Sequence, residues 1–282
     1  PLTSVRIRVG LPITFCANLH NRKFLNMSVD QRNGEVMTIK TVGVIGAGQM
    51  GNGIAQVASC AGFDVILVDM SDELLDKALG TIQFSLGKLV SKERMSQEEA
   101  DAAIGRISVG TDRALCKEAD LVVEAIPEVL EWKLELFKDL DSICPAHTIL
   151  ASNTSSISIT KIASATSRPD KVIGMHFMNP VPIMKLVEVI RAYNTSDDVT
   201  QNIMDLSKNL GKVPVEVNDY PGFVANRILM PMINEAIYTL FEGVAGVEEI
   251  DTVMKLGMAH PMGPLQLADF IGLDICLAIL RV

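Results

Sequence analysis

The 282-residue chain has few of the features that mark metal-binding, disulfide-stabilised or membrane proteins. Its five cysteines are scattered and form no C-x-x-C pair, which favours reduced thiols in an intracellular protein over a disulfide framework. Its four histidines show no spacing typical of metal ligands. No apolar run approaches the ~20 residues that a membrane-spanning helix needs. We therefore expect no metal site and no membrane partner.

The charge balance and the length set two further bounds. The formal net charge is −9 and no basic block offsets it, which argues against a nucleic-acid surface. Apolar residues make up 48% of the chain, so we expect a globular protein, and 282 residues are enough for two domains.

The first 36 residues differ in character from the rest. They contain five basic residues but only two acids, Asp30 and Glu35, a bias that suits an organelle transit segment. The chain begins with Pro1, so this stretch could also be upstream sequence before a start at Met27 or Met37, or the chain could be a fragment. We treat 1–37 as an extension outside the fold. The expected location is the cytoplasm, or an organelle matrix if the extension is a transit segment.

A glycine motif dominates the sequence after Thr41. A β-branched run from Val42 to Ile45 is followed by "GAGQMG", in which Gly46, Gly48 and Gly51 form G-x-G-x-x-G. A helical pattern then runs over 49–60, and a second strand, "DVILVD", ends in an acid 23 residues after the first glycine. This strand–turn–helix context makes the motif a strong predictor of dinucleotide binding.

Each part of the motif has a physical role. The three glycines permit the tight turn, the approach of the backbone to a pyrophosphate, and the packing of helix on strand. The helix N-terminus offers free N–H groups to the phosphates. Asp69 can accept hydrogen bonds from both ribose hydroxyls and would repel a 2′-phosphate, so the sequence favours NAD over NADP. The alternative is an ordinary turn that binds nothing.

Strands and helices continue to alternate, which predicts a doubly wound, mostly parallel sheet of the Rossmann type. We expect further strands at 107–111, 121–126, 148–153 and 171–177, with helices at 72–90 and 130–140 between them. Ligands bind at the carboxyl ends of such strands. The polar residues expected at this edge are Glu124, Glu128, Lys133, Asn153, Thr154, Ser155 and His176.

His176 lies on one arm of a predicted hairpin. The segment "GMHFMNPVPIMKLVEVI" places His176 six residues before Pro182 and Glu188 six residues after it. A hairpin centred on Pro182 therefore makes the two residues cross-strand neighbours. The carboxylate would fix the imidazole tautomer and leave the other nitrogen free to take a proton, which predicts a general base. A buried structural pair is the alternative; a metal ligand is disfavoured.

Several motifs together resemble the L-3-hydroxyacyl-CoA dehydrogenase family, and the bacterial-type 3-hydroxybutyryl-CoA dehydrogenases look most similar. The resemblance covers the chain from Thr41 to about Ala278. It rests on "GVIGAGQMGNGIAQ", "LASNTSSISIT", "VIGMHFMNPVPIMKLVEVI", "PGFVANRILMPMINEA" and "HPMGPLQLADFIGLD". It implies an NAD-dependent oxidoreductase that interconverts short-chain (S)-3-hydroxyacyl-CoA and 3-ketoacyl-CoA.

The resemblance also implies residue roles. His176 would be the general base, Glu188 its orienting partner, Ser155 a ligand of the substrate oxygen, and Asn226 a substrate contact. The implied dinucleotide contacts are Gly46, Ala47, Gly48, Gln49, Met50, Gly51, Asp69, Glu128, Lys133, Ser155 and Asn179. The implied coenzyme A contacts are Ser85, Lys92 and Lys133. For Ser85 and Lys92 the alternative is a solvated helix face, and for Ser155 it is the N-cap of the helix that follows.

Two domains follow from these observations: an NAD-binding domain over 38–219 and a helical substrate and dimerisation domain over 220–282. We expect three helices in the latter, at 223–241, 247–256 and 264–280. Family members continue further, so we expect this domain to be truncated and the homodimer interface to be incomplete.

Two other functions remain open. The chain could be a catalytically impaired NAD-binding fragment of the same family, although His176, Glu188 and Ser155 are all present. It could also be a β-hydroxyacid dehydrogenase, whose base is a lysine on an interdomain helix; the predicted His–Glu hairpin argues against that.

Overall fold

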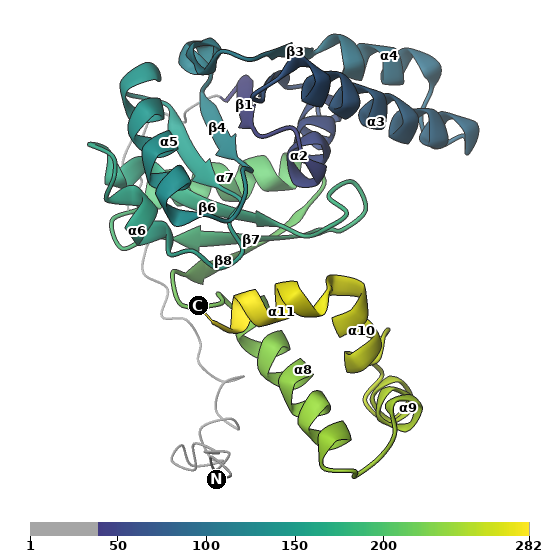
Figure 1. Ribbon diagram of the computed structural model, residues 1–282. Helices are drawn as coiled ribbons and strands as arrows, with labels where there is room; N and C mark the ends of the chain where they lie inside the picture. Colours follow the sequence, from purple (N-terminus) through teal and green to yellow (C-terminus); the bar gives the residue numbers. More distant parts are fainter. Residues whose placement is uncertain (1–38, 282) are drawn as a thin grey trace, which may run out of the picture. The chain divides into compact units, whose positions relative to one another are not determined.

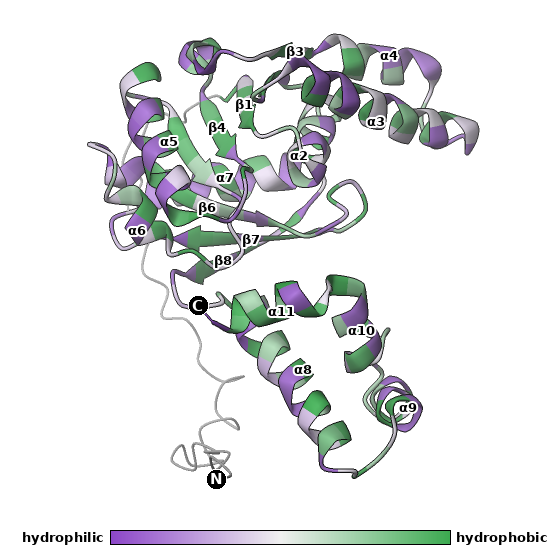
Figure 2. Ribbon diagram, in the orientation of Figure 1, coloured by the Kyte–Doolittle hydropathy of each residue, from purple (hydrophilic) through white to green (hydrophobic). Residues whose placement is uncertain are grey.

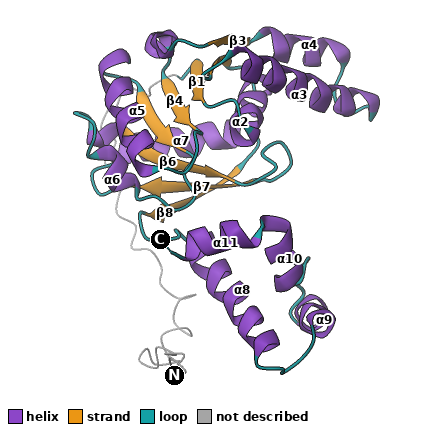
Figure 3. Ribbon diagram, in the orientation of Figure 1, coloured by secondary structure: helices purple, strands orange, loops and turns teal. Residues whose placement is uncertain are grey.

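A computed structural model describes residues 39–281 (Figure 1). The extension predicted at 1–37 lies outside the described residues. Within them, an α/β segment comes first and is followed by a segment made only of helices (Figure 3). This order is the one expected from the sequence.

One eight-stranded sheet forms the centre of the α/β segment, with strand order β3-β2-β1-β4-β5-β6-β7-β8. All neighbouring strands are parallel except β6 and β7, which pair antiparallel. The strands are β1 (Thr41–Ile45), β2 (Asp64–Val68), β3 (Ile107–Gly110), β4 (Leu121–Glu124), β5 (Ile149–Ser152), β6 (Val172–Phe177), β7 (Leu186–Arg191) and β8 (Val213–Asn218). The predicted doubly wound, mostly parallel sheet is therefore confirmed.

Helices cover both faces of this sheet, as a doubly wound sheet requires. Apolar residues of α2 (Gln49–Cys60), α3 (Asp72–Ser91), α4 (Gln97–Gly105) and α7 (Asp197–Asn209) share one core with the strands. Residues of α5 (Leu130–Ile143), α6 (Ile159–Ala163) and the 3₁₀ turn η1 (Arg113–Glu118) form the core on the other face. A second 3₁₀ turn, η2 (Pro169–Lys171), precedes β6. Figure 2 shows the central strands as mostly hydrophobic.

The central strands are buried along their whole length because both faces are covered. All four residues of β4 and all six of β6 are buried. In such strands a charged side chain costs free energy unless it has a partner. Glu124 on β4, His176 on β6 and Glu188 on β7 are therefore the residues whose contacts need an explanation.

The helical segment contains α8 (Ala225–Phe241), α9 (Val247–Gly257), α10 (Pro264–Ile271) and α11 (Leu273–Leu280). Its small core includes Met230, Ile233, Ala268 and Cys276. The helix predicted at 264–280 is in fact two helices. Gly272 has φ +100°, a backbone conformation that side chains rarely adopt, and it ends α10 and starts α11.

The remaining differences from the sequence reading are omissions. The sequence did not reveal α4, α7 or β8, and it indicated α6 only as the helix that Ser155 would cap, whereas the helices predicted at 49–60 and 72–90 match α2 and α3 closely. Serine side chains cap the N-termini of four of these helices: Ser71 caps α3, Ser96 caps α4, Ser158 caps α6, and Ser196 caps α7. Among residues 39–281, none of the helices has the length and apolar character needed to cross a membrane.

Candidate active site

The glycine turn lies where the order of the strands reverses. The chain leaves β1 at Ile45, and β1 pairs with β2 on one side and with β4 on the other. Gly46 has φ +100°, and a Cβ there would lie 2.6 Å from the Ala125 carbonyl oxygen. A Cβ on Gly51 would lie 1.6 Å from the Gly46 carbonyl oxygen. Both positions therefore require glycine, as the motif predicts.

The turn has the properties that a dinucleotide requires. A Cβ on Gly48 would meet no atom within 4 Å, so the fold leaves open space beside this position. The first turn of α2 has no acidic residue and its N-cap has no side-chain hydrogen bond, so its N–H groups are available to phosphate. The Asp69 carboxylate, at the end of β2, accepts hydrogen bonds from the N–H groups of Ala47 (2.5 Å) and Met70 (2.6 Å). These residues fit NAD.

A buried ion pair occupies the ends of β4 and α5. Glu124 is 0% exposed and Lys133 is 1% exposed, and Lys133 Nζ lies 2.5 Å from Glu124 Oε1. Lys133 Nζ also donates to the Ile126 carbonyl oxygen and forms an ion pair with Glu128 Oε2, both at 3.3 Å. Glu124 also accepts hydrogen bonds from the Ile126 N–H (2.7 Å) and the Ser152 hydroxyl (2.6 Å). Lys133 therefore has three partners, all of them within the protein.

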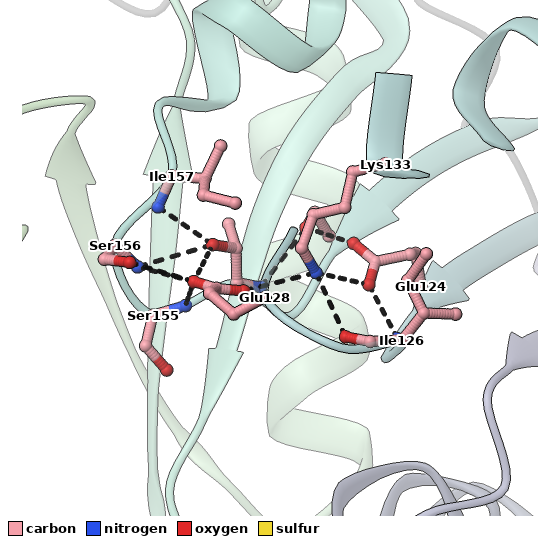
Figure 4. Close-up of polar contacts among 9 residues, drawn as sticks. Glu124, Ile126, Glu128, Lys133, Ser155, Ser156 and Ile157 are labelled. Atoms are coloured by element: carbon pink, nitrogen blue, oxygen red, sulfur yellow. Dashed lines mark hydrogen bonds and ion pairs between the residues drawn. The ribbon is translucent and has the colours of Figure 1, made fainter. Parts of the chain in front are cut away.

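Glu128 organises the loop that follows β5 (Figure 4). Its Oε1 accepts hydrogen bonds from the Thr154 hydroxyl (2.5 Å), the Ser155 N–H (3.0 Å), and the N–H (3.1 Å) and hydroxyl (3.0 Å) of Ser156. Burial alone would raise the pKa of Glu128, but the charge of Lys133 and the hydrogen bonds from Thr154 and Ser156 outweigh it and lower that pKa. Glu128 is thus an anion that fixes the backbone on both sides of Ser155.

Ser155 itself has a hydroxyl free for other partners. None of residues 39–281 forms a hydrogen bond with that hydroxyl, and in Figure 4 it points away from Glu128. The alternative role as a helix cap is wrong, because the N-cap of α6 is Ser158. The Asn226 side-chain amide, on α8, donates to the Ser155 carbonyl oxygen at 3.0 Å.

His176 and Glu188 form the cross-strand pair that the hairpin register predicts. His176 is 6% exposed and Glu188 is 2% exposed, and His176 Nδ1 lies 2.8 Å from Glu188 Oε2. Within the described part of the chain, Nε2 of His176 has no hydrogen-bond partner. The ring of Phe223 lies beside the imidazole, with 5.9 Å between ring centroids. One imidazole nitrogen is held and the other can exchange a proton.

Glu188 is held in turn by the start of the helical segment. Its Oε1 accepts hydrogen bonds from the N–H groups of Val224 (3.1 Å) and Ala225 (3.0 Å), which stand at the beginning of α8. Burial would raise the pKa of Glu188, but the hydrogen bonds from His176, Ala225 and Val224 outweigh it, so the pKa lies below its ordinary value. Glu188 therefore remains ionised at neutral pH.

The other predicted site residues do not belong to this hydrogen-bonded cluster. Asn179 is exposed in the loop between β6 and β7. Ser85 is half-buried on α3, and Lys92 is exposed at the C-cap of that helix. Three or more metal-ligating side chains do not gather anywhere in residues 39–281.

Some residues of the cluster were not predicted as site residues. Ser156 binds Glu128, and the Asn153 side chain accepts from the Phe177 N–H at 2.9 Å, which joins the ends of β5 and β6. Val224 and Ala225 contribute only backbone N–H groups, so no side-chain motif could reveal them. The only signal for Asn153 and Ser156 was their place at a strand end.

Comparison with known proteins agrees with this arrangement. Residues 41–220 match the 3-hydroxyacyl-CoA dehydrogenase NAD binding domain, and residues 222–282 match the C-terminal domain of the same family. The chain is 52% identical to the 3-hydroxybutyryl-CoA dehydrogenase of Bradyrhizobium diazoefficiens over 244 residues, which are 86% of this chain and 83% of that protein. It is 45% identical to human mitochondrial hydroxyacyl-coenzyme A dehydrogenase over 268 residues, 93% and 85% of the two chains.

A solved structure is similar over the same region. The crystal structure of (S)-3-hydroxybutyryl-CoA dehydrogenase from Ralstonia eutropha superposes with a TM-score of 0.85 at 51% identity, covering 86% of each chain. The glycine turn, the parallel sheet and these matches define an NAD-dependent dehydrogenase. The chain belongs to the 3-hydroxyacyl-CoA dehydrogenase family.

Proposed function

We propose that the protein interconverts short-chain (S)-3-hydroxyacyl-CoA and 3-ketoacyl-CoA, with His176 as the general base. The observation that carries this proposal is the buried 2.8 Å contact between His176 Nδ1 and Glu188 Oε2, which leaves Nε2 without a hydrogen-bond partner among residues 39–281. The proposed short-chain preference rests on the similarity to two 3-hydroxybutyryl-CoA dehydrogenases, those of Bradyrhizobium diazoefficiens and Ralstonia eutropha.

Each residue of the pair has a definite task. In alcohol oxidation, His176 Nε2 takes the hydroxyl proton of the substrate, and in the reverse direction the imidazolium returns it. Glu188 stabilises the imidazolium and fixes its orientation, while the N–H groups of Val224 and Ala225 keep the carboxylate in place. NAD, when bound, supplies the acceptor for the hydride that leaves the substrate carbon.

The loop after β5 provides the second polar contact for the substrate. The free hydroxyl of Ser155 is suited to donate a hydrogen bond to the substrate oxygen as that oxygen becomes a carbonyl. Glu128 and Asn226 hold the backbone of Ser155 from two sides, at its N–H and at its carbonyl oxygen. Asn226 therefore contributes to substrate binding through the position of Ser155.

The cofactor contacts follow the glycine turn. The backbone from Gly46 to Gly51 and the start of α2 would hold the pyrophosphate, and Asp69 would hold the adenosine ribose. Lys133 already has three internal partners, so we assign its influence on bound ligands to Glu128, with which it pairs. Asn179 remains a proposed contact of the dinucleotide.

Coenzyme A and the partner subunit are proposed to bind elsewhere. The α3 arm carries the half-buried Ser85 and, at its C-terminal end, the exposed Lys92, and Lys88 of the same helix lies over the Phe84 ring, 4.1 Å from its centroid. The ammonium groups of Lys88 and Lys92 suit the phosphates of coenzyme A.

Helices α8–α11 carry large exposed apolar side chains, including Ile228, Phe241, Leu256 and Phe270, which supports a homodimer through this segment.

The test compares substrates and one variant. With NADH, the protein should reduce acetoacetyl-CoA and should act poorly on free acetoacetate, because coenzyme A supplies binding energy. His176→Gln should lower kcat about 10²- to 10⁴-fold, the usual contribution of a general base, and leave NADH binding unchanged. Comparable kcat/KM for the thioester and the free acid, or a His176→Gln variant with nearly full activity, would contradict the proposal. If the wild-type protein also fails to reduce acetoacetyl-CoA, that result would support the alternative of a catalytically impaired NAD-binding fragment.

A further inference from the structure

Lys212 is a buried ammonium that the proposed chemistry does not use. It directly precedes β8, and it is only 8% exposed. None of residues 39–281 places a carboxylate within 4.0 Å of its Nζ, unlike Lys133, which has two such partners. Burial lowers the pKa of Lys212. A buried cation without a counter-ion is costly, so its other contacts need a reason.

Those contacts are two backbone carbonyl groups of a single loop. Lys212 Nζ donates to the carbonyl oxygen of Val181 and, at 2.9 Å, to that of Met184. Both residues lie in the loop that joins β6 to β7, between His176 and Glu188 in the sequence. The two carbonyl dipoles compensate the charge of the ammonium in place of a counter-ion, and the two hydrogen bonds fix the conformation of the loop.

The same loop packs closely against the helix that follows the glycine turn. Val181 belongs to the core on that face of the sheet. A Cβ on Gly53 of α2 would lie 2.8 Å from Val181 Cβ, closer than real Cβ contacts, so loop and helix meet without spare room. In Figure 1 this loop projects beside α2.

We propose that Lys212 is a positioning residue that sets the catalytic hairpin against the dinucleotide-binding helix by holding the carbonyl groups of Val181 and Met184. The inference rests on the proposed roles of His176 and Glu188, because it concerns the hairpin that carries them. Gly53 contributes to the same positioning, because the absence of a Cβ at this residue allows the loop between β6 and β7 to approach α2.

The consequence is a fixed spacing between base and cofactor. The glycine turn and α2 would hold the dinucleotide, whereas the hairpin holds His176 Nε2 at the reacting oxygen. Without the two hydrogen bonds of Lys212, the loop can shift relative to α2. A displacement of about 1 Å can reduce a rate about 100-fold, although binding of the adenosine half is unaffected.

The experiment uses the full chain with two substitutions at one site. Lys212→Met keeps the apolar stem but removes both donors and the charge, and Lys212→Arg retains donors and charge. We expect Lys212→Met to lower kcat for acetoacetyl-CoA reduction about 10- to 100-fold. NADH affinity, measured by fluorescence titration, should change less than about threefold, and Lys212→Arg should recover part of kcat. Lys208→Met is the matched control, because Lys208 is an exposed lysine in the last turn of α7.

If Lys212 had a purely structural role, the variants would show a different pattern of stability and activity. Lys212→Met would then have a lower melting temperature but an unchanged kcat per folded molecule, and that result would overturn the inference. So would a Lys212→Arg variant no better than Lys212→Met. Gly53→Ala tests the contact between the loop and α2 from the side of the helix, and it keeps the inference testable if Lys212→Met does not fold. In Gly53→Ala, kcat should fall while NADH still binds. Gly80→Ala is its control, because a Cβ at Gly80 meets no atom within 4 Å.

The base assignment is tested separately. A fully active His176→Gln variant would refute the proposed function whatever Lys212 does. An inactive His176→Gln variant together with a fully active Lys212→Met variant would refute only the positioning role.

Discussion

Two buried carboxylates at the strand ends of this sheet, Glu124 and Glu188, each pair with a nitrogen base, yet the two pairs differ in one respect. Lys133 has three internal partners: it hydrogen-bonds to Glu124 and to the Ile126 carbonyl group, and it forms an ion pair with Glu128. His176 hydrogen-bonds to Glu188 through one nitrogen, and its other nitrogen has no partner in the described part of the chain. Burial and charge are similar in both, so neither property alone distinguishes structure from chemistry.

What distinguishes a structural pair from a reactive one is the number of donor and acceptor atoms that have no partner within the protein. A saturated pair, whose polar atoms all have internal partners, can only stabilise the fold, and Lys133 and Glu124 join β4, α5 and the end of β5 in this way. An unsaturated pair can exchange a proton with a ligand. Glu188 resembles the saturated case, because both of its oxygens are occupied, and it therefore supports His176 without reacting itself.

The largest effect that sharpens this comparison concerns Lys133. Lys133→Met should lower the free energy of unfolding by about 3–5 kcal/mol, because it leaves the Glu124 charge buried without its partner. Adding Glu124→Gln should restore part of the loss. Urea denaturation followed by circular dichroism measures both, with Lys138→Met on the exposed side of α5 as the control.

The kcat of the folded Lys133→Met variant decides whether Lys133 has only a structural role. Molecules of Lys133→Met that remain folded should lose far less kcat than His176→Gln does, and His176→Gln should unfold near the wild-type midpoint. If folded Lys133→Met is as inactive as His176→Gln, then Lys133 takes part in the chemistry and the distinction fails.

A smaller effect is expected from acid. The pKa values of Glu188 and Glu128 are lowered in the folded state, so the folded protein binds fewer protons than the unfolded chain. The stability that these carboxylates contribute is therefore fully present above pH 4.5, the ordinary value, and is lost as pH falls through their lowered values. The pH dependence of unfolding below pH 4.5 should be shallower in Glu188→Gln. An equal slope in both proteins would mean that Glu188 gains nothing from its partners.

The sequence predicted those parts of the site that depend on local pattern or on symmetry about a turn. The glycine turn is local, and the pairing of His176 with Glu188 follows from equal distances to Pro182. The hydrogen bonds that Glu128 accepts around Ser155 were not predicted, because they join residues 26 to 28 positions apart through two hydroxyl groups and two backbone N–H groups. Glu128 was expected to contact the dinucleotide, a role that stays a prediction.

Long-range contacts explain the other omissions. Lys212 is an ordinary lysine in the sequence, and only the fold brings its ammonium to the loop before β7. The break at Gly272 was missed because the apolar pattern runs through it without interruption, although glycine is the residue that permits a positive φ. Helix α7, by contrast, carried a usable signal in the Ser196 cap and the two acids after it.

The central claim is that His176 and Glu188 act as one unit, and a double-mutant cycle tests it most directly. The kcat of acetoacetyl-CoA reduction would be measured for His176→Gln, for Glu188→Gln and for the double variant. If Glu188 works only through His176, the double variant should be no slower than His176→Gln alone, within about threefold. Losses that multiply in the double variant would show that the two residues act independently, and the general-base pair would be wrong.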